Sequence, residues 1–597
     1  MKILTKLSSF AAVCTCAATV LAGCGSTKQA DFSATAQTAL PKIDMSAWNY
    51  NEADNVYWQV GISYAATPAD KKYETLGIFV PGEYFTATKN ANGKYTATVN
   101  KKGTVAGLTV DTAPFVMPIQ TPGYSALEAP TGYQAATAQY IANGFIFVYT
   151  GARGRDHGVP AAVTDFKAAV RYVRYNADLL PGDTARFFTY GMSGGGAQSA
   201  LMGATGDAPE YEPYLQAIGA VEGVSDAIMG SMDWCPITNL NVADEAYEWE
   251  LGVARTGLDE STQALSNALA VKFAEYINAL GLKDENGNLL TLEQSADGLY
   301  HAGSYYGYLK KTIEKSLNNF LSDTTFPYNA SSQKQALGNN MMMTGGFPPQ
   351  GMGNRMPPQG QPTRGNPPAA EDLDGVHRRK GKSNNVDLSG TYNSVEEYIA
   401  ALNANENWVS YDKATNTATI TSVEAFMRNV KQLQKSVGAF DDLSGTQPEN
   451  TLFGFGDGKG AHFDALMLEA LKETGNAKAD EYAADLAKKD ALGSTMEERH
   501  NMYNPMYYLA SSYKGFKTST PAKYWRIHAG IFQGDTAVST EMDYYLALVN
   551  YGSAVKSVEF ADVWGLYHTE AERPTYGDGT STGNFILWVQ ECLKNEK

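Results

Sequence analysis

The residues best suited to chemistry lie in residues 187–201, where a Gly-x-Ser-x-Gly motif centres on Ser193. An apolar run precedes the motif and a helix-forming run follows it, which predicts a strand, a tight turn and a helix. A serine on such a turn exposes its hydroxyl as a nucleophile, and Gly191 and Gly195 leave room for the turn. An ordinary glycine-rich turn is the alternative. Residues 579–583 also match the motif, but polar turn residues surround them and no apolar strand precedes them, so we interpret them as a loop.

A nucleophilic serine needs a base, and the chain has seven histidines. His568 follows the last predicted strand and precedes the closing helix, which is the position of the base when the triad runs in the order Ser, acid, His. We predict that His568 is the base; a histidine of a surface loop is the alternative. His528 lies within an apolar strand and is predicted to be structural. The other five precede the region expected for the acid: His157, His301, His377, His462 and His500.

The acid that orients the base should follow the predicted strand that ends near Gly530. The usual position, three residues after the glycine, is occupied by Gln533, which carries no charge but can accept a hydrogen bond from Nδ1. We predict that Asp535 is the catalytic acid. The oxyanion hole should combine the N–H of Gly194 with that of Gly123, which lies after an earlier strand.

The composition limits the partners of the chain. Its 597 residues, 43% hydrophobic and 19% charged, suffice for a large core and one or two domains. A net charge of −17 without a long basic run argues against nucleic-acid binding. The glycine-rich residues 454–460 lack the spacing of a nucleotide loop, and residues 284–288 lack the distal glutamate of a calcium loop. We therefore expect no cofactor and no metal. Cys235 and Cys592, the two cysteines expected in the mature core, are predicted to be buried free thiols, with a disulfide between them as the alternative.

The N-terminus predicts export. Residues 1–23 have a basic end, an apolar run and the closing sequence Leu-Ala-Gly-Cys, which looks like a bacterial lipobox. Cleavage there would leave Cys24 as a lipidated N-terminal residue, anchoring an extracytoplasmic lipoprotein to the outer face of the cell membrane. Ordinary secretory cleavage at Ala22 is the alternative. Residues 24–45 read as a flexible tether, and no other apolar stretch is long enough to cross a bilayer.

Strand-like and helical patterns alternate along the rest of the chain. Strands are predicted at 59–64, 75–80, 113–119, 145–149, 187–190, 217–229, 524–529 and 555–563, and helices at 164–178, 542–551 and 584–593. This order predicts an α/β fold with a mostly parallel sheet, built from residues 46–240 and 516–597. Between them, residues 241–515 form a mostly helical insertion, predicted to be a lid over the ligand-binding edge of the sheet. Within it, residues 329–385 are rich in Met, Pro and Gly and are predicted to be disordered.

Four segments of the chain resemble bacterial tannases: residues 191–206 around Ser193, residues 151–156 (Gly-Ala-Arg-Gly-Arg-Asp), residues 235–240 (Cys-Pro-Ile-Thr-Asn-Leu) and residues 246–249 (Ala-Tyr-Glu-Trp). The resemblance extends from about residue 54 onward, apart from the Met/Pro/Gly-rich segment. It implies an α/β-hydrolase fold with a large lid, and hydrolysis of galloyl esters through a Ser/Asp/His triad.

The resemblance also implies residues that bind substrate. Tannases hold the galloyl hydroxyls with a lysine and a glutamate of the lid, and Lys435 and Glu449 have the matching spacing. A solvated charge on the lid is the alternative for each. Tannases typically carry Asp-x-Asp after the acid strand, whereas this chain has Gln533, Gly534 and Asp535. Asp535 therefore takes either the triad role or only the substrate role, and Gln533 is assigned to substrate binding.

The sequence as a whole predicts a surface-anchored serine esterase for a small phenolic ester of the galloyl type. One alternative is a feruloyl esterase or a general carboxylesterase. The other is a polyphenol-binding lipoprotein with a degraded triad, which the neutral side chain of Gln533 suggests.

Overall fold

A computed structural model describes residues 36–330 and 385–596 of the chain. The predicted signal peptide, Cys24 and His377 lie outside the described residues, as does most of the segment predicted to be disordered. Asn329, at the start of that segment, is described and belongs to a short strand.

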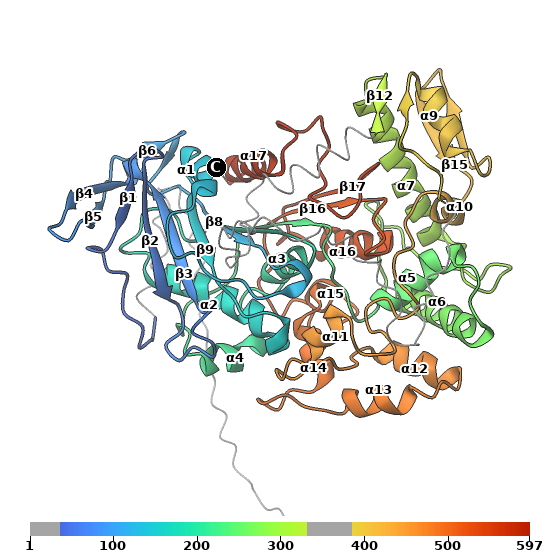
Figure 1. The fold of residues 1–597 in the computed structure, drawn as a ribbon, viewed down its shortest axis with the longest axis horizontal. Helices are drawn as coiled ribbons and strands as arrows, with labels where there is room; N and C mark the ends of the chain where they lie inside the picture. The colour runs from blue at the N-terminus through green and yellow to red at the C-terminus, as the bar shows by residue number, and fades with distance from the viewer. Residues whose placement is uncertain (1–35, 331–384, 597) are drawn as a thin grey trace, which may run out of the picture.

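A nine-stranded sheet forms the centre of the molecule (Figure 1). Its strands lie in the order β1 (Asn49–Asn51), β2 (Val56–Ser63), β3 (Thr75–Pro81), β9 (Ile146–Thr150), β8 (Phe115–Ile119), β10 (Phe187–Met192), β11 (Gly230–Trp234), β16 (Tyr524–Gly530) and β17 (Ser557–Val563). The six strands from β9 to β17 are parallel, while β1, β2 and β3 pair antiparallel. The predicted mostly parallel sheet is therefore confirmed.

The predicted strand at 217–229 is wrong. The helix α4 (Glu212–Ala217) ends where that strand was to begin, and the strand β11 starts only at Gly230. Two glycines of the intervening segment, Gly219 and Gly223, have φ values of 65° and 71°, which an extended strand does not accommodate. Farther along the chain, the helix α10 spans Val423–Asn429.

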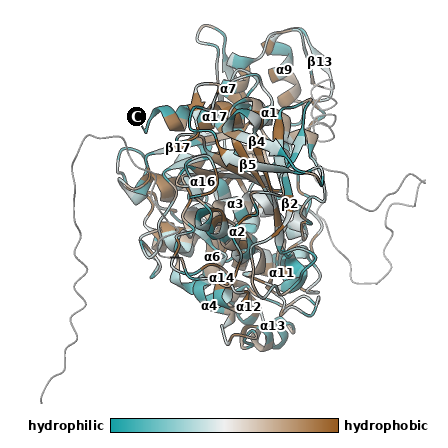
Figure 2. Ribbon diagram, turned by 90° about the vertical axis from the view of Figure 1, so that its left-hand side faces the viewer, coloured by the Kyte–Doolittle hydropathy of each residue, from teal (hydrophilic) through white to brown (hydrophobic). Residues whose placement is uncertain are grey.

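Helices cover both faces of the sheet. Residues of α1 (Ala138–Ala142) and α17 (Ser581–Lys594) share one buried cluster with the strands, and Figure 1 places these two helices side by side. On the other face, α2 (Ala161–Tyr175), α3 (Gly194–Ala204) and α16 (Val538–Tyr551) contribute to a second cluster. Figure 2 shows hydrophobic residues concentrated in the interior, where the sheet lies, and hydrophilic ones toward the periphery. The helices therefore bury the sheet on both sides, as parallel strands require.

The regular elements among the described residues of 241–515 are mainly helices, which gather away from the N-terminal strands and are coloured green to orange in Figure 1. These helices are α5 (Ala243–Leu251), α6 (Glu260–Leu280), α7 (Ser304–Asp323), α9 (Val395–Leu402), α10, α11 (Pro448–Phe453), α12 (Ala465–Glu473), α13 (Ala479–Leu486), α14 (Met496–Met502) and α15 (Pro505–Leu509). Two small antiparallel pairs accompany them: β12 (Tyr328–Asn329) with β13 (Thr391–Tyr392), and β14 (Val409–Asp412) with β15 (Thr417–Ile420). The mostly helical character predicted for this region agrees with these elements, while its role as a lid stays a prediction.

Cys235 and Cys592 are both free and buried, as predicted. Burial raises the pKa of the Cys235 thiol to about 12, so the thiol is neutral at physiological pH. No helix in the two described ranges is long and apolar enough to span a membrane.

Candidate active site

Ser193 occupies a strained turn between β10 and α3. Its φ of 62° and ψ of −127° lie in a region that non-glycine residues rarely adopt. Two glycines make the turn possible: a Cβ on Gly191 would lie 2.4 Å from the carbonyl oxygen of Gly195, and one on Gly195 would lie 2.1 Å from that of Ile119. The Ser193 N–H donates to the carbonyl oxygen of Trp234, 3.0 Å away, which ties the turn to β11. The turn thus has the strand–turn–helix geometry of a nucleophile elbow.

The loop after β17 brings His568 to Ser193 across 375 positions of the chain. Its Nε2 lies 2.8 Å from the Ser193 Oγ, a hydrogen bond through which the ring can take the hydroxyl proton. Burial lowers the pKa of His568 below its ordinary value of 6.5, Asp535 opposes that shift and Lys435 adds to it. The imidazole is therefore neutral at pH 7, the form that a general base requires.

Gln533 supplies the contact to the other ring nitrogen. Its Oε1 lies 2.6 Å from the Nδ1 of His568, whereas the nearer carboxylate oxygen of Asp535 lies 3.7 Å away, beyond a hydrogen bond but within ion-pair range. Gln533 is 2% exposed, and its Nε2 donates to Glu541 at 3.0 Å. Both ends of the Gln533 side chain are thus engaged inside the protein, one with His568 and one with Glu541, and its assignment to substrate binding stays a prediction.

The predicted oxyanion donors lie on adjoining backbone segments. Gly194 is the first residue of α3, so its N–H has no acceptor within the helix. Gly123 lies in the turn η3 (Pro122–Tyr124) with a φ of 54°, and its carbonyl oxygen accepts a hydrogen bond from the Arg155 guanidinium. The two segments touch, because a Cβ on Gly194 would lie only 2.6 Å from the backbone nitrogen of Tyr124. Arg155 therefore fixes the turn beside the nucleophile, a role that the sequence did not reveal.

Lys435 and Glu449 come close to the same site from the insertion. Glu449 is 4% exposed, and its Oε2 has no hydrogen-bond partner in the described part of the chain. Burial raises the pKa of Glu449; Lys435 and Arg155 lower it, and Asp535 raises it. The Lys435 ammonium lies 3.7 Å from the centre of the Phe440 ring. The electrostatic coupling of Glu449 and His568 to Lys435 shows that these charges lie near one another.

Among the residues that the sequence did not single out, Glu541 has the most direct link to the site. It lies on α16, is fully buried, and accepts from Gln533 and, at 2.8 Å, from the Thr536 hydroxyl. No motif marks it, because a glutamate in the first turn of a helix is common. Of the other histidines, His528 proves structural, since its ring nitrogens contact the Ala571 carbonyl and Glu559.

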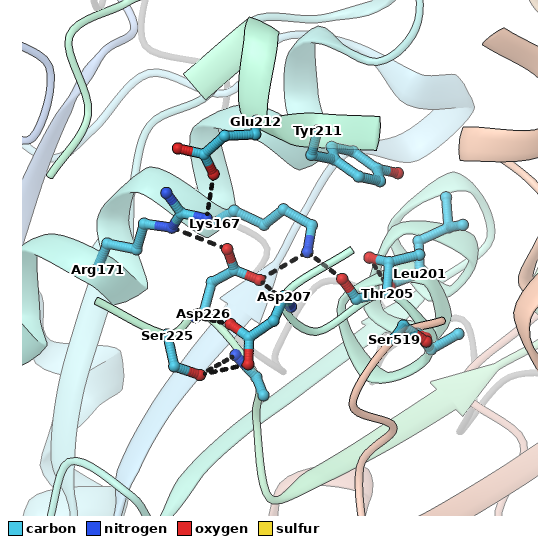
Figure 3. A network of polar contacts seen from close by, with 12 residues as sticks. Lys167, Arg171, Leu201, Thr205, Asp207, Tyr211, Glu212, Ser225, Asp226 and Ser519 are labelled. Carbon is cyan, nitrogen blue, oxygen red and sulfur yellow. Dashed lines mark hydrogen bonds and ion pairs between the residues drawn. The ribbon is translucent and has the colours of Figure 1, made fainter. Parts of the chain in front are cut away.

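A buried polar network anchors the far end of α3 (Figure 3). The Lys167 ammonium donates to the carbonyl oxygen of Thr205, just past the last turn of α3, and to Asp226 at 2.7 Å. Arg171 bridges Asp226 and Glu212, at 2.9 Å in each case. Because removing one partner of such a buried pair costs about 3–5 kcal/mol, the network holds α3 firmly against α2. The helix whose N-terminus adjoins Ser193 is thereby held at its other end.

No group of three or more potential metal ligands occurs among residues 36–330 and 385–596. The second Gly-x-Ser-x-Gly match begins α17, where Thr580 is the N-cap and its side chain accepts from the Gly583 N–H. Ser581 thus lies at a helix start rather than on a strand-to-helix elbow.

Comparisons with known proteins agree with this geometry. Residues 111–279, which include Ser193, match the model of the BD-FAE family, an esterase family. No curated protein sequence matches the chain. The crystal structure of tannase from Fusobacterium nucleatum is similar with a TM-score of 0.62 and 25% identity, over 90% of this chain and 95% of that one. Tannin acyl hydrolase from Lactobacillus plantarum is similar with a TM-score of 0.60 and 25% identity, over 90% and 94% of the two chains.

Similar structures also include tannin acyl hydrolase in complex with ethyl gallate, with a TM-score of 0.57 and 25% identity, and in complex with 3,4-dihydroxybenzoate, with a TM-score of 0.56 and 26% identity. Each covers 90% of this chain and 94% of the similar chain. These similarities support an ester hydrolase with an α/β-hydrolase-like fold that resembles the bacterial tannases over nine-tenths of the chain.

Proposed function

We propose that the protein is a serine esterase that hydrolyses phenolic carboxylic esters of the galloyl type through an acyl-enzyme. The observation that carries the proposal is the 2.8 Å contact between the Ser193 Oγ and the His568 Nε2, at a strained turn between a strand and a helix. The contact of Gln533 with Nδ1 supports it further, because Nε2 of the neutral ring is then free to accept a proton.

In the proposed reaction the Ser193 Oγ attacks the ester carbonyl carbon while its proton passes to the His568 Nε2. The carbonyl oxygen becomes an oxyanion that the N–H groups of Gly194 and Gly123 stabilise, each donor contributing about 3 kcal/mol. His568 then returns the proton to the departing alcohol oxygen, leaving an acyl group on Ser193. Water, deprotonated by the same nitrogen, attacks the acyl carbon, and the bond to Ser193 breaks as His568 returns the proton to the Ser193 Oγ and the acid leaves. Asp535 balances the charge of the transient imidazolium.

The phenolic specificity rests on charged side chains of the insertion. A buried carboxylate with a free oxygen, as in Glu449, accepts hydrogen bonds from adjacent phenolic hydroxyls, and the Lys435 ammonium donates to one of them. The similar structures with ethyl gallate and 3,4-dihydroxybenzoate support ligands of this class. In this proposal residues 241–515 act as the lid that carries both groups over the nucleophile.

The decisive test is hydrolysis of methyl gallate by the wild-type protein and by Ser193→Ala. Loss of the nucleophile should abolish turnover and leave the melting temperature nearly unchanged. Ser581→Ala, in the second Gly-x-Ser-x-Gly match, is the matched control and should keep full activity. If Ser193→Ala still hydrolysed methyl gallate or a p-nitrophenyl ester, the proposal would be wrong.

Assays on the wild-type protein and on Ser193→Ala also test two other functions. A feruloyl esterase or general carboxylesterase would hydrolyse methyl ferulate or simple esters faster than methyl gallate. A polyphenol-binding protein with a degraded triad, which the neutral Gln533 favours, would not react with a fluorophosphonate probe. Labelling that disappears in Ser193→Ala excludes the binding protein.

We also propose that the enzyme is an extracytoplasmic lipoprotein, anchored by a lipidated Cys24 to the outer face of the cell membrane. The test is expression of the full chain in bacteria and separation of membrane and soluble fractions. Cys24→Ala should move the protein out of the membrane fraction and prevent labelling by a fatty-acid probe. Equal membrane association of both forms would refute the anchor.

A further inference from the structure

The side chain of Gln533 is held between two groups that fix its orientation. Its Oε1 faces the His568 Nδ1 at 2.6 Å, and its Nε2 donates to the Glu541 Oε1 at 3.0 Å. Thr536 donates to the same carboxylate oxygen at 2.8 Å. Glu541 is fully buried, and its Oε2 has no hydrogen-bond partner in the described part of the chain. A chain of hydrogen bonds thus runs from Ser193 through His568 and Gln533 to a buried carboxylate.

The two ends of an amide differ chemically, so the orientation of Gln533 matters. An ionised carboxylate only accepts hydrogen bonds, so Glu541 requires the amide NH₂ group of Gln533 to face it. The amide oxygen is left to face His568, and the Nδ1 of the neutral ring must then carry the proton. With the amide reversed, Nδ1 would have to accept and Nε2 would carry the proton, so the ring could not take a proton from Ser193.

We infer that Glu541 is a positioning residue for the esterase reaction: through the amide of Gln533 it holds His568 in the tautomer that accepts the Ser193 proton. The inference rests on the proposed function. Glu541 does not contact the ring, because Gln533 lies between them. A neutral amide, that of Gln533, occupies the position that the triad acid usually holds. The carboxylate therefore acts on the imidazole indirectly, by setting which end of Gln533 meets it.

Ionisable groups from four segments lie close enough to Glu541 to interact with it electrostatically: Lys431 after α10, Glu250 on α5, Asp562 on β17 and Cys235 after β11. Burial raises the pKa of Glu541 to about 7, the Lys431 ammonium lowers it and Glu250 raises it. Lys431, itself buried, opposes this shift, so the carboxylate is ionised mainly above about pH 7, and the orientation that it imposes on Gln533 applies in that pH range.

The first test is Glu541→Gln, assayed for kcat and KM on methyl gallate across pH 5–9. A neutral amide at 541 no longer dictates which end of Gln533 faces the ring, so kcat should fall about tenfold while KM stays within about twofold. Glu250→Gln is the matched control. It also removes a buried carboxylate that binds α16, through the N–H groups of Val538 and Ser539, but it does not touch Gln533. It should lower the melting temperature and leave kcat above pH 7 unchanged; because Glu250 raises the pKa of Glu541, any change in the pH profile should appear only below that range.

The second test exchanges the two side chains. In Gln533→Glu with Glu541→Gln, the carboxylate faces the imidazole directly and the new amide donates to it. The double variant has the same composition and charge as the wild type, and its kcat should recover to within about threefold of the wild-type value. A merely structural role for Glu541 predicts no such recovery.

A third measurement uses the wild-type protein and does not depend on a variant that folds. Nitrogen-15 NMR of histidine-labelled protein above pH 7 should show neutral His568 protonated at Nδ1. Protonation at Nε2 would overturn the inference. So would a Glu541→Gln protein with wild-type kcat and pH profile, or a double variant no more active than Glu541→Gln. Failure of the proposed function gives a different result: the wild type itself would neither hydrolyse methyl gallate nor react with a fluorophosphonate.

Discussion

The close contact between Gly194 and the turn 121–124 makes Gly194→Ala the sharpest test of the proposed oxyanion hole. A Cβ at 194 would lie 2.6 Å from the Tyr124 nitrogen and 2.8 Å from the Thr121 oxygen, where ordinary contacts begin at 3.4 Å. Both neighbours are backbone atoms, so the turn must move by about 0.8 Å as a unit. Gly123 would move with it, and a displacement of about 1 Å in a catalytic group costs on the order of 100-fold in rate. Loss of one oxyanion donor has a similar cost.

The assay is kcat and KM on methyl gallate, together with the melting temperature. We expect kcat to fall about 100-fold with little change in KM, and overpacking to destabilise the fold by about 1–3 kcal/mol. Gly307→Ala, in α7, is the control: a Cβ there meets nothing within 4 Å, so the variant should keep full activity and gain about 0.5–1 kcal/mol of stability. A Gly194→Ala enzyme with kcat within threefold of the wild type would refute the assignment of this turn to the oxyanion hole.

The remaining predictions concern charges around the site. Arg155→Met removes the donor to the Gly123 carbonyl, so kcat on methyl gallate should fall about tenfold; an unchanged kcat would show that the turn holds without it. Activity needs neutral His568, whose pKa is lowered by burial and by Lys435, so in Glu541→Gln, where no carboxylate at 541 titrates, kcat/KM should be retained as pH falls to 6.5 and decline only below it. Asp535→Asn removes the charge that raises this pKa and should move the decline to lower pH, whereas full turnover with an unchanged profile would exclude Asp535 from the triad. Glu449→Gln and Lys435→Met should each lower kcat/KM for methyl gallate about tenfold relative to p-nitrophenyl acetate, and equal losses on both substrates would contradict a role in binding phenolic hydroxyls.

The sheet could be predicted wherever a buried strand is a continuous apolar run. The strand β9 is such a run, and its predicted position is confirmed to within one residue. The strand β11 could not be found this way, because two of its five buried residues, Ser231 and Asp233, are polar. They are satisfied by each other at 2.7 Å and by Tyr544, which donates to Asp233 at 3.0 Å from α16. This buried polar pair breaks the apolar pattern, and Tyr544, which bonds to it, lies more than 300 positions farther along the chain.

In the site, the residues with local signals could be placed and those without them could not. Ser193 has a motif, and His568 has a position between the last strand and the closing helix. Gln533 and Asp535 are two positions apart on one loop, and sequence spacing does not decide which of them reaches the ring. Whether Glu541 reaches Gln533 depends on which side of α16 faces that loop. Tertiary packing sets these contacts: it places the Gln533 oxygen 2.6 Å and the Asp535 oxygen 3.7 Å from Nδ1.

In this geometry two side chains share the roles that a single carboxylate has in a Ser/His/Asp triad. Gln533, 2.6 Å from Nδ1, sets the orientation and tautomer of His568, but it carries no charge. Asp535, 3.7 Å from Nδ1, is too far for a hydrogen bond, yet a charge at that distance stabilises an imidazolium by about 4 kcal/mol at an effective dielectric constant of 20. Substituting either residue should therefore slow the enzyme in a different way: loss of the amide disturbs the orientation of the neutral ring, and loss of the carboxylate disfavours its protonated form. Because orientation is needed at every pH, a Gln533→Leu enzyme should be slower across the whole pH profile, whereas the effect of Asp535→Asn should include a displaced acidic limb.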